Sequence, residues 1–254
     1  MRSDDRAVSE VLGFALVFGL VVATVAIVSV GGLGSLQDAR DAEQVNNAER
    51  AFDVLADNMD DLSQERAPSR ATEISLASAQ VIVAEPVEVT FRGYAGPSSP
   101  ANFSETYDVS PIVYRPDNGQ TEVVYVAGAV FRTQPDGSLV LRRPAIRATE
   151  GQIIVPLIQT RSRSVQSFSG GTVRVRADRS QTALLVTDDE GTYEEFYMNV
   201  TSPRAEAWQT ALDAYPEFDC SLDTSGPVDR AWCLAEDPER VQVPLVRVDV
   251  ELTS

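Results

Sequence analysis

Residues 11–30 read VLGFALVFGLVVATVAIVSV, and only two glycines, one threonine and one serine interrupt this apolar run. No charged residue follows the run before Asp38. Twenty helical residues, at about 1.5 Å each, cover the roughly 30 Å hydrocarbon core of a bilayer. The sequence therefore predicts one membrane-spanning helix at about residues 11–30.

A cleaved secretory signal is the alternative interpretation of this run. Such a signal has an apolar region of only about 7–15 residues, followed by a cleavage site of small residues. The run here is longer, but Gly31, Gly32 and Gly34 imitate such a site, so the alternative stays open. Two arginines precede the span and no basic residue follows it before Arg40, which predicts a cytoplasmic N-terminus and an extracellular body.

Residues 38–65 continue the helix with an amphipathic pattern. Apolar residues recur every three or four positions, acidic residues occupy the other faces, and Pro68 ends the pattern. We thus expect one helix over residues 7–66. Its first half is expected to contact lipid or other copies of itself, and its second half to pack on a folded body. The predicted stripe consists of Ala42, Val45, Ala48, Phe52, Leu55, Met59 and Leu62.

Residues 72–254 change to short apolar runs separated by proline and glycine turns. This pattern of short apolar runs and turns predicts a mainly antiparallel β domain, either a sandwich or barrel-like. Together with the N-terminal helix, it gives the fold class α+β. The parity of the apolar residues changes beside Pro244, where a bulge or an edge position is expected. The predicted strands are residues 74–83, 87–93, 107–115, 121–132, 138–143, 152–160, 172–177, 183–187, 192–200 and 241–252.

One additional helix is predicted to interrupt these strands. Ser202 would be its N-cap and Pro203 its first helical residue. Trp208, Leu212 and Tyr215 would form its buried stripe.

The composition excludes several function classes. All 21 basic residues are arginine, because the 254-residue chain contains no lysine and no histidine. Histidine triads, imidazole–zinc sites and lysine Schiff bases are therefore excluded, and no catalytic motif is found. The sequence predicts no enzyme, no cofactor and no metal site. A net charge of −17 argues against a nucleic-acid partner.

The acidic, lysine-free composition is also typical of organisms that live in high salt. There the charges are screened over about 3 Å at 1 M salt. The alternative is an ordinary acidic protein from a GC-rich genome.

Two cysteines and two glycosylation motifs are candidate modification sites. Outside the cell we expect Cys220 and Cys233 to form a disulfide; the alternative is two free thiols. Asn102-Phe103-Ser104 and Asn199-Val200-Thr201 match the acceptor pattern for N-glycosylation. Asn102, in a predicted loop, is the better candidate, because Asn199 ends a predicted strand.

The N-terminal segment resembles a known family. The run Arg6-Ala7-Val8-Ser9-Glu10-Val11-Leu12-Gly13, between two aspartates and the apolar run, resembles the N-terminus of archaeal type IV pilins. It is especially similar to pilin-like surface proteins of salt-loving archaea, which carry a short charged leader, Ala-Val-Ser-Pro-Val-Ile-Gly and a hydrophobic helix. The resemblance covers roughly residues 1–35 and says nothing about the body.

This resemblance implies a maturation step and a set of partners. Residues 1–6 would be a leader that a prepilin-type peptidase removes between Arg6 and Ala7. The helix would then anchor the protein in the bilayer and pack against other pilin-like subunits in a surface filament, in which the large body indicates a minor subunit. The sequence departs from the family at Glu10, where proline is usual. The alternative function is a membrane-anchored extracellular β domain that acts as a binding module outside any filament.

Overall fold

Helix α1 (Asp4–Gln64) is the first element of the structure. It contributes residues to two compact units of the chain, which divide after Gln44. The computed structural model describes residues 4–65, 67–96, 101–117, 121–149, 151–162, 166–188 and 192–254, without the side chains of 4–10, 30–33 and 38. Residues 1–44 form one unit and Val45–Ser254 the other, which we call the β domain. The expected helix over residues 7–66 is therefore observed as Asp4–Gln64, and the first strand begins at Ser69, three residues before the predicted body.

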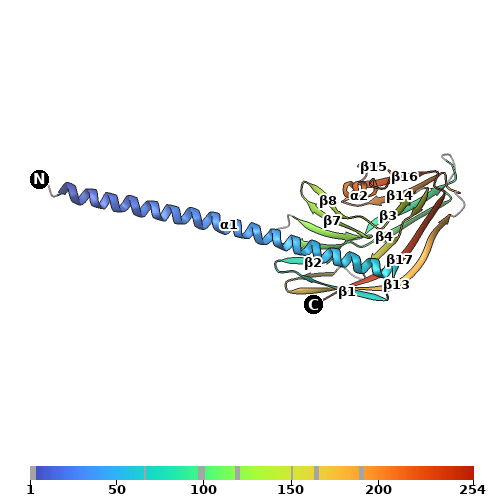
Figure 1. The fold of residues 1–254 in the computed structure, drawn as a ribbon, viewed down its shortest axis with the longest axis horizontal. Helices are drawn as coiled ribbons and strands as arrows, with labels where there is room; N and C mark the ends of the chain where they lie inside the picture. The colour runs from blue at the N-terminus through green and yellow to red at the C-terminus, as the bar shows by residue number, and fades with distance from the viewer. Residues whose placement is uncertain are drawn as a thin grey trace. The chain divides into compact units, whose positions relative to one another are not determined.

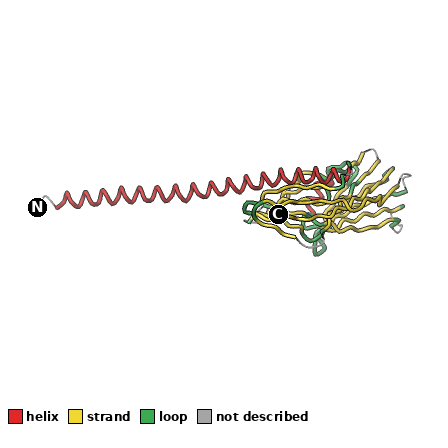
Figure 2. Tube along the Cα trace, turned by 90° about the horizontal axis from the view of Figure 1, so that it is seen from below, coloured by secondary structure: helices red, strands yellow, loops and turns green. Residues whose placement is uncertain are grey.

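Strands make up most of the β domain (Figures 1 and 2). Within the described residues they form three sheets, mainly antiparallel as expected. Sheet A contains β1 (Ser69–Ser75), β13 (Thr172–Asp188), β17 (Arg240–Thr253), β10 (Gln152–Ile154), β9 (Arg147–Thr149) and β11 (Leu157–Arg161). Sheet B contains β12 (Gln166–Ser169), β2 (Ala79–Val83), β5 (Ile112–Pro116), β6 (Glu122–Val126), β7 (Ala129–Gln134) and β8 (Gly137–Arg142). Sheet C contains β15 (Asp219–Asp223), β16 (Arg230–Glu236), β14 (Glu195–Thr201), β3 (Val87–Tyr94) and β4 (Phe103–Val109).

Sheet B is the central layer, because both faces of its middle strands β5, β6 and β7 are buried. Val124 and Phe131 lie in one apolar cluster, which we call the first core, together with residues of sheet C. Tyr114, Val123 and Tyr125 point the other way, into the second core, which also contains residues of sheet A and of helix α1. Successive side chains of a strand point to opposite faces, so a central strand that is apolar at every position serves two cores.

Strand β17 passes from one core to the other just after Pro244, between Leu245 and Val246. Val241 and Val243 lie in the first core, whereas Val248 and Val250 lie in the second. The expected bulge is present, but on the neighbouring strand: the β13 register shifts between Leu184 and Val186, beside the pairing with Pro244. The extra residue restores the pairing where β17 changes parity.

Helix α2 (Ala205–Leu212) covers β15 and β16 of sheet C and lies beside β8 (Figure 1). Trp208 and Leu212 are buried as predicted, and Trp208 packs edge-on against Phe131, with ring centroids 5.2 Å apart. The predicted start of this helix at Ser202 and Pro203 is wrong. The Ser202 amide donates to the Asp229 carbonyl oxygen (3.0 Å), which continues the pairing of β14 with β16 and delays the helix. Tyr215 lies beyond the helix end, half-buried.

Several predicted strands are divided in the structure. The run 121–132 is a hairpin, because Ala127 and Gly128 adopt φ values of +47° and +85° in the two-residue turn between β6 and β7. The run 152–160 is broken at Val155-Pro156 into β10 and β11, and both pair parallel with β17. Conversely, the runs 172–177 and 183–187 form one strand, β13, with register irregularities.

Candidate functional site

The first part of helix α1 presents an apolar surface to its surroundings. All described side chains from Val11 to Ser29 are exposed, among them Phe14 and Phe18, which stack with ring centroids 6.0 Å apart. This is the one helix in the described part of the chain that is long and apolar enough to cross a membrane, with a mean hydropathy of 2.8 over its most apolar window. So much exposed apolar surface suggests single-pass membrane anchoring.

The pilin-like residues lie at the beginning of the same helix. The Arg6–Ala7 bond is in the first turn of α1, and Val8, Ser9 and Glu10 follow as helical residues. The side chains of these residues lie outside the described part of the chain. An added methyl group at Gly13 would meet no other described part of the chain, so this position of the helix is uncovered among the described residues.

The second part of α1 is built into the β domain. Phe52, Leu55, Met59 and Leu62 of the predicted stripe are buried in the second core, as is Ala48. Burying a large apolar side chain stabilises the fold by about 1.5–3 kcal/mol. Apolar packing therefore dominates the attachment of this helix end. The predicted stripe begins later than expected, because Ala42 is exposed.

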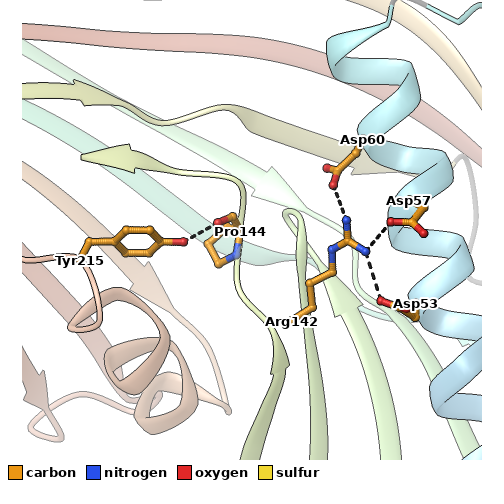
Figure 3. A network of polar contacts seen from close by, with 6 residues as sticks. All are labelled: Asp53, Asp57, Asp60, Arg142, Pro144 and Tyr215. Atoms are coloured by element: carbon orange, nitrogen blue, oxygen red, sulfur yellow. Dashed lines mark hydrogen bonds and ion pairs between the residues drawn. The ribbon is translucent and has the colours of Figure 1, made fainter. Parts of the chain in front are cut away.

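Arg142, the last residue of β8, joins three aspartates of helix α1 (Figure 3). Its guanidinium donates to Asp60 at 2.7 Å, to Asp57 at 2.6 Å and to Asp53 at 3.2 Å. We call these four residues the Arg142 clamp. Asp53, Asp57 and Asp60 lie on one helix face because they are four and three positions apart. The clamp fixes which face of the helix meets sheet B.

Burial governs the charge of the clamp. The Asp60 side chain is 19% exposed and that of Arg142 is 26% exposed. Burial raises the pKa of Asp60, and the nearby Arg142 charge only partly opposes this effect. The Arg142 pKa is raised above its usual value, because hydrogen bonds and charges of Asp57 and Asp60 outweigh its burial. Arg142 is thus the counter-charge that allows Asp60 to be ionised there.

Further polar contacts hold the same helix end. Glu49 accepts a hydrogen bond from Arg132 of β7 at 3.0 Å. Asp61 accepts one from Arg70 of β1 at 2.9 Å. The helix end is therefore tied to sheets A and B at once.

Cys220 and Cys233 form a disulfide, as the sequence predicts. The two residues face each other across β15 and β16, with Cα atoms 4.1 Å apart. The turn between these strands is fastened by Asp223, which accepts hydrogen bonds from Ser225 and Arg230. The Ser225 hydrogen bonds, helped by Arg230, lower the pKa of Asp223 to about 2. The segment that the disulfide closes is therefore a hairpin of β15 and β16.

The two glycosylation motifs have different surroundings. Asn102 is exposed, next to the start of β4, and its Oδ1 accepts a weak hydrogen bond from the Ala95 amide at 3.4 Å. Asn199 is only 7% exposed, within β14. The Asn199 side chain is too buried in the folded domain to enter the active site of a glycosyltransferase, so we keep Asn102 alone as the predicted glycosylation site.

No metal site emerges from the described residues, in which no group of three His, Cys, Asp or Glu side chains could hold an ion. A hollow of about 670 Å³ lies beside β4 and β11. Two of its polar side chains already have partners within the domain: Arg247 donates to Gln159 (2.8 Å), which donates to the Asp108 carbonyl oxygen (2.9 Å). We therefore interpret these hydrogen bonds as structural contacts and do not assign a ligand site to this hollow.

The ionic contacts of the helix end, the Arg142 clamp among them, were not predicted from the sequence. The spacing of Asp53, Asp57 and Asp60 was a readable signal for a cationic partner, although it could not identify Arg142. The pilin-like motif and the disulfide were found, but they lie in separate parts of the chain. The chain thus has three separate features: an apolar helix segment, a clamped helix end and a disulfide-bonded β domain.

Comparison with known proteins adds a family. A profile described as a family of unknown function, DUF7289, matches residues 6–251. The chain belongs to DUF7289. The matched residues include the apolar helix, the clamp and strands of all three sheets. No curated protein and no solved structure matches the chain.

Proposed function

We propose that the chain is a type IV pilin-like protein of the cell surface, held in the membrane by residues 11–30 with its β domain outside. The observation that carries this proposal is the run Ala7–Gly13, which lies at the start of a helix whose apolar side chains are exposed from Val11 to Ser29. The same helix continues into the second core. A pilin-type subunit requires a helix of this kind, apolar on all sides in its first half and packed against a β domain in its second half.

Two further observations support export of the β domain. The disulfide Cys220–Cys233 belongs to an oxidising compartment. Arginines lie before the span and none follows it until Arg40, an asymmetry that favours a cytoplasmic N-terminus. The acidic composition further supports a salt-loving source, and the resemblance of residues 6–13 to archaeal pilins supports an archaeal one.

Maturation in this proposal consists of one cleavage. A prepilin-type peptidase cuts between Arg6 and Ala7 at the cytoplasmic face, and the helix remains as the anchor. N-terminal sequencing of the protein from native membranes tests this step. Ala7 as the first residue supports the proposal, whereas a retained Met1 or a new terminus near Gly34 contradicts it.

Assembly into filaments is the second step of the proposal. Apolar helices from several subunits would pack together and keep their side chains from water, as lipid does. Cleavage would also create an α-amino group at Ala7, a counter-charge for Glu10 of the same or a neighbouring subunit. Burying a carboxylate without a partner costs several kcal/mol, so this pair would set the register between subunits.

The Glu10→Gln variant tests assembly separately from anchoring. We expect normal processing and membrane retention, but at least a tenfold lower recovery in sheared surface filaments. Glu43→Gln is the matched control, because it removes an exposed carboxylate of α1 outside the apolar segment. If wild-type protein is absent from filaments while it stays in the membrane, the alternative of an anchored binding module is the better description.

A further inference from the structure

The outward face of sheet C carries three aromatic side chains on adjacent strands. Tyr94 of β3, Tyr197 of β14 and Trp232 of β16 are each partly exposed. The Tyr197 ring centroid is 5.6 Å from that of Tyr94 and 6.2 Å from that of Trp232. We call these three side chains the aromatic row. Their chain neighbours, such as Phe196 and Cys233, are buried in the first core, so the row lies on the face away from it.

The ring orientations divide the row into a platform and a wall. The Tyr197 and Trp232 planes differ by 36°, which gives a broad tilted surface. The Tyr94 plane stands at 85° to that of Tyr197 and closes one end of this surface. The spacing of the rings is close to the length of one sugar ring, so the platform accommodates one or two of them.

Hydrogen-bonding groups lie directly beside the aromatic row. Arg92, Glu195, Asn199 and Arg230 line the same hollow of about 380 Å³ as the three rings. Glu195 accepts a hydrogen bond from the Tyr197 hydroxyl at 3.0 Å, and Arg230 is paired with Asp223. Among the described residues no hydrogen bond or ion pair uses the Arg92 guanidinium, so its donors remain available.

Asn199 is the second, independent sign of a ligand. Its side chain is more than nine-tenths buried at the base of this hollow, and its Oδ1 has no hydrogen-bond partner within the described residues. A buried amide without a partner costs free energy, so such groups are rare in folded proteins and call for an explanation. A ligand that exchanges hydrogen bonds with this amide provides one.

The chemistry of the hollow selects one class of ligand. Arg92 and Arg230 disfavour a cationic ligand, and the charged groups around the rings disfavour an apolar protein surface. The net charge of −17 disfavours nucleic acid. A sugar combines an apolar ring face, which stacks on aromatic rings, with hydroxyl groups that both donate and accept hydrogen bonds. Arginine supplies donors, glutamate accepts, and asparagine does both.

We infer that the Tyr94–Tyr197–Trp232 face binds an oligosaccharide, with sugar rings on Tyr197 and Trp232 and hydroxyl groups on Arg92, Glu195 and Asn199. This site is independent of the helix, so it holds whether or not the chain is a pilin. It would let the β domain recognise a glycan on another surface.

Tryptophan fluorescence offers a direct test. The chain has two tryptophans, and Trp208 is fully buried. In a full-length Trp208→Phe background, purified in detergent, the emission therefore reports Trp232. We expect at least one of four probes, the hexasaccharides of glucose, mannose, N-acetylglucosamine or galacturonic acid, to shift this emission saturably. Preference for the galacturonic acid probe would assign Arg92 to a sugar carboxylate, and preference for a neutral probe would assign it to hydroxyl groups.

Variants in the otherwise native full-length chain, assayed by calorimetry, complete the test. Arg92→Gln and Trp232→Ala should each weaken binding at least tenfold, and Trp232→Phe should retain part of it. Tyr107→Ala is the matched control, because this partly exposed tyrosine lies on the opposite face of sheet C, outside the hollow. If none of the four saccharides binds, or if Trp232→Ala and Arg92→Gln bind as well as the control, the inference is wrong.

Discussion

The Arg142 guanidinium donates a hydrogen bond to the Asp60 carboxylate at 2.7 Å, between residues 82 positions apart in the chain. This contact joins the last residue of β8 to a helix end whose other face is buried in the second core (Figure 3). Apolar packing supplies most of the attachment, and the clamp selects the rotation of the helix. Its removal should therefore weaken the domain without abolishing the fold.

Arg142→Gln should lower the free energy of unfolding by about 1–3 kcal/mol, since it leaves Asp60 partly buried without its counter-charge. Arg174→Gln is the control, because its ion pair with Glu73 is more than half exposed and such pairs contribute less than about 1 kcal/mol. Denaturant unfolding of both full-length variants in detergent measures the difference. Equal losses would show that the clamp contributes no more than a surface ion pair.

The effect of Arg142→Gln should also depend on pH. Burial raises the folded-state pKa of Asp60, so its protonation adds stability as the pH falls through that raised pKa toward the unfolded value of 3.8. Without Arg142 the pKa rises further. The destabilisation should hence be largest at pH 7 and shrink toward pH 4, as Asp60 takes up a proton. Thermal unfolding at both pH values tests this, and a loss that is the same or larger at pH 4 contradicts it.

Loss of the disulfide should have a limited effect. Closing a loop of about 14 residues contributes roughly 3 kcal/mol. Cys220→Ser combined with Cys233→Ser should lower the unfolding free energy by up to this amount, with the β domain still folded, because both cores include many residues far from the hairpin. Denaturant unfolding with and without reductant checks the value. The wild type in reductant should match the double variant, and global unfolding of either would be against this expectation.

Substitutions of Trp208 separate two contributions to stability that have opposite signs. The packing of the indole ring stabilises the fold, whereas its buried N–H, without a partner in the described part of the chain, destabilises it. Trp208→Ala should cost about 3–5 kcal/mol, because it removes the largest fully buried side chain. Trp208→Phe should cost much less. It leaves a smaller cavity and removes an indole N–H that has no hydrogen-bond partner among the described residues. Near-equal losses in chemical unfolding would mean that the cavity dominates both variants.

Glycan occupancy should differ between the two acceptor motifs. Asn102 is exposed and Asn199 is buried, so glycopeptide mass spectrometry of protein from native membranes should find a glycan on Asn102 alone. Ser104→Ala should remove this glycan, and Thr201→Ala should leave it in place. A glycan on Asn199, or none on Asn102, would refute the assignment.

The sequence predicted the fold where its pattern was periodic and long. The apolar run, the stripe around Phe52 and Met59, and the parity change at Pro244 each follow from one repeating rule. Turns without a typical signature were missed. Ala127-Gly128 lacks the Asn-Gly or Asp-Gly pair that marks such a turn, so one strand was expected where a hairpin forms.

The candidate sites were predictable to different degrees. Pairing of the cysteines needed only their number and compartment. The clamp and the aromatic row depend on which strands become neighbours, and no local pattern gives this information. Glu195, Tyr197 and Asn199 alternate visibly with apolar residues, so their shared face was readable, but their proximity to Arg92 and Trp232 was not.

The position of β17 has a consequence for the order of folding. This strand has 14 residues; up to Leu245 it contributes side chains to the first core, and from Val246 onward to the second core. It comes after every other described strand along the chain. Neither core can close until β17 has been synthesised, so the β domain completes its folding only after this strand has left the ribosome. The two cores should then form, and be lost, in one cooperative step.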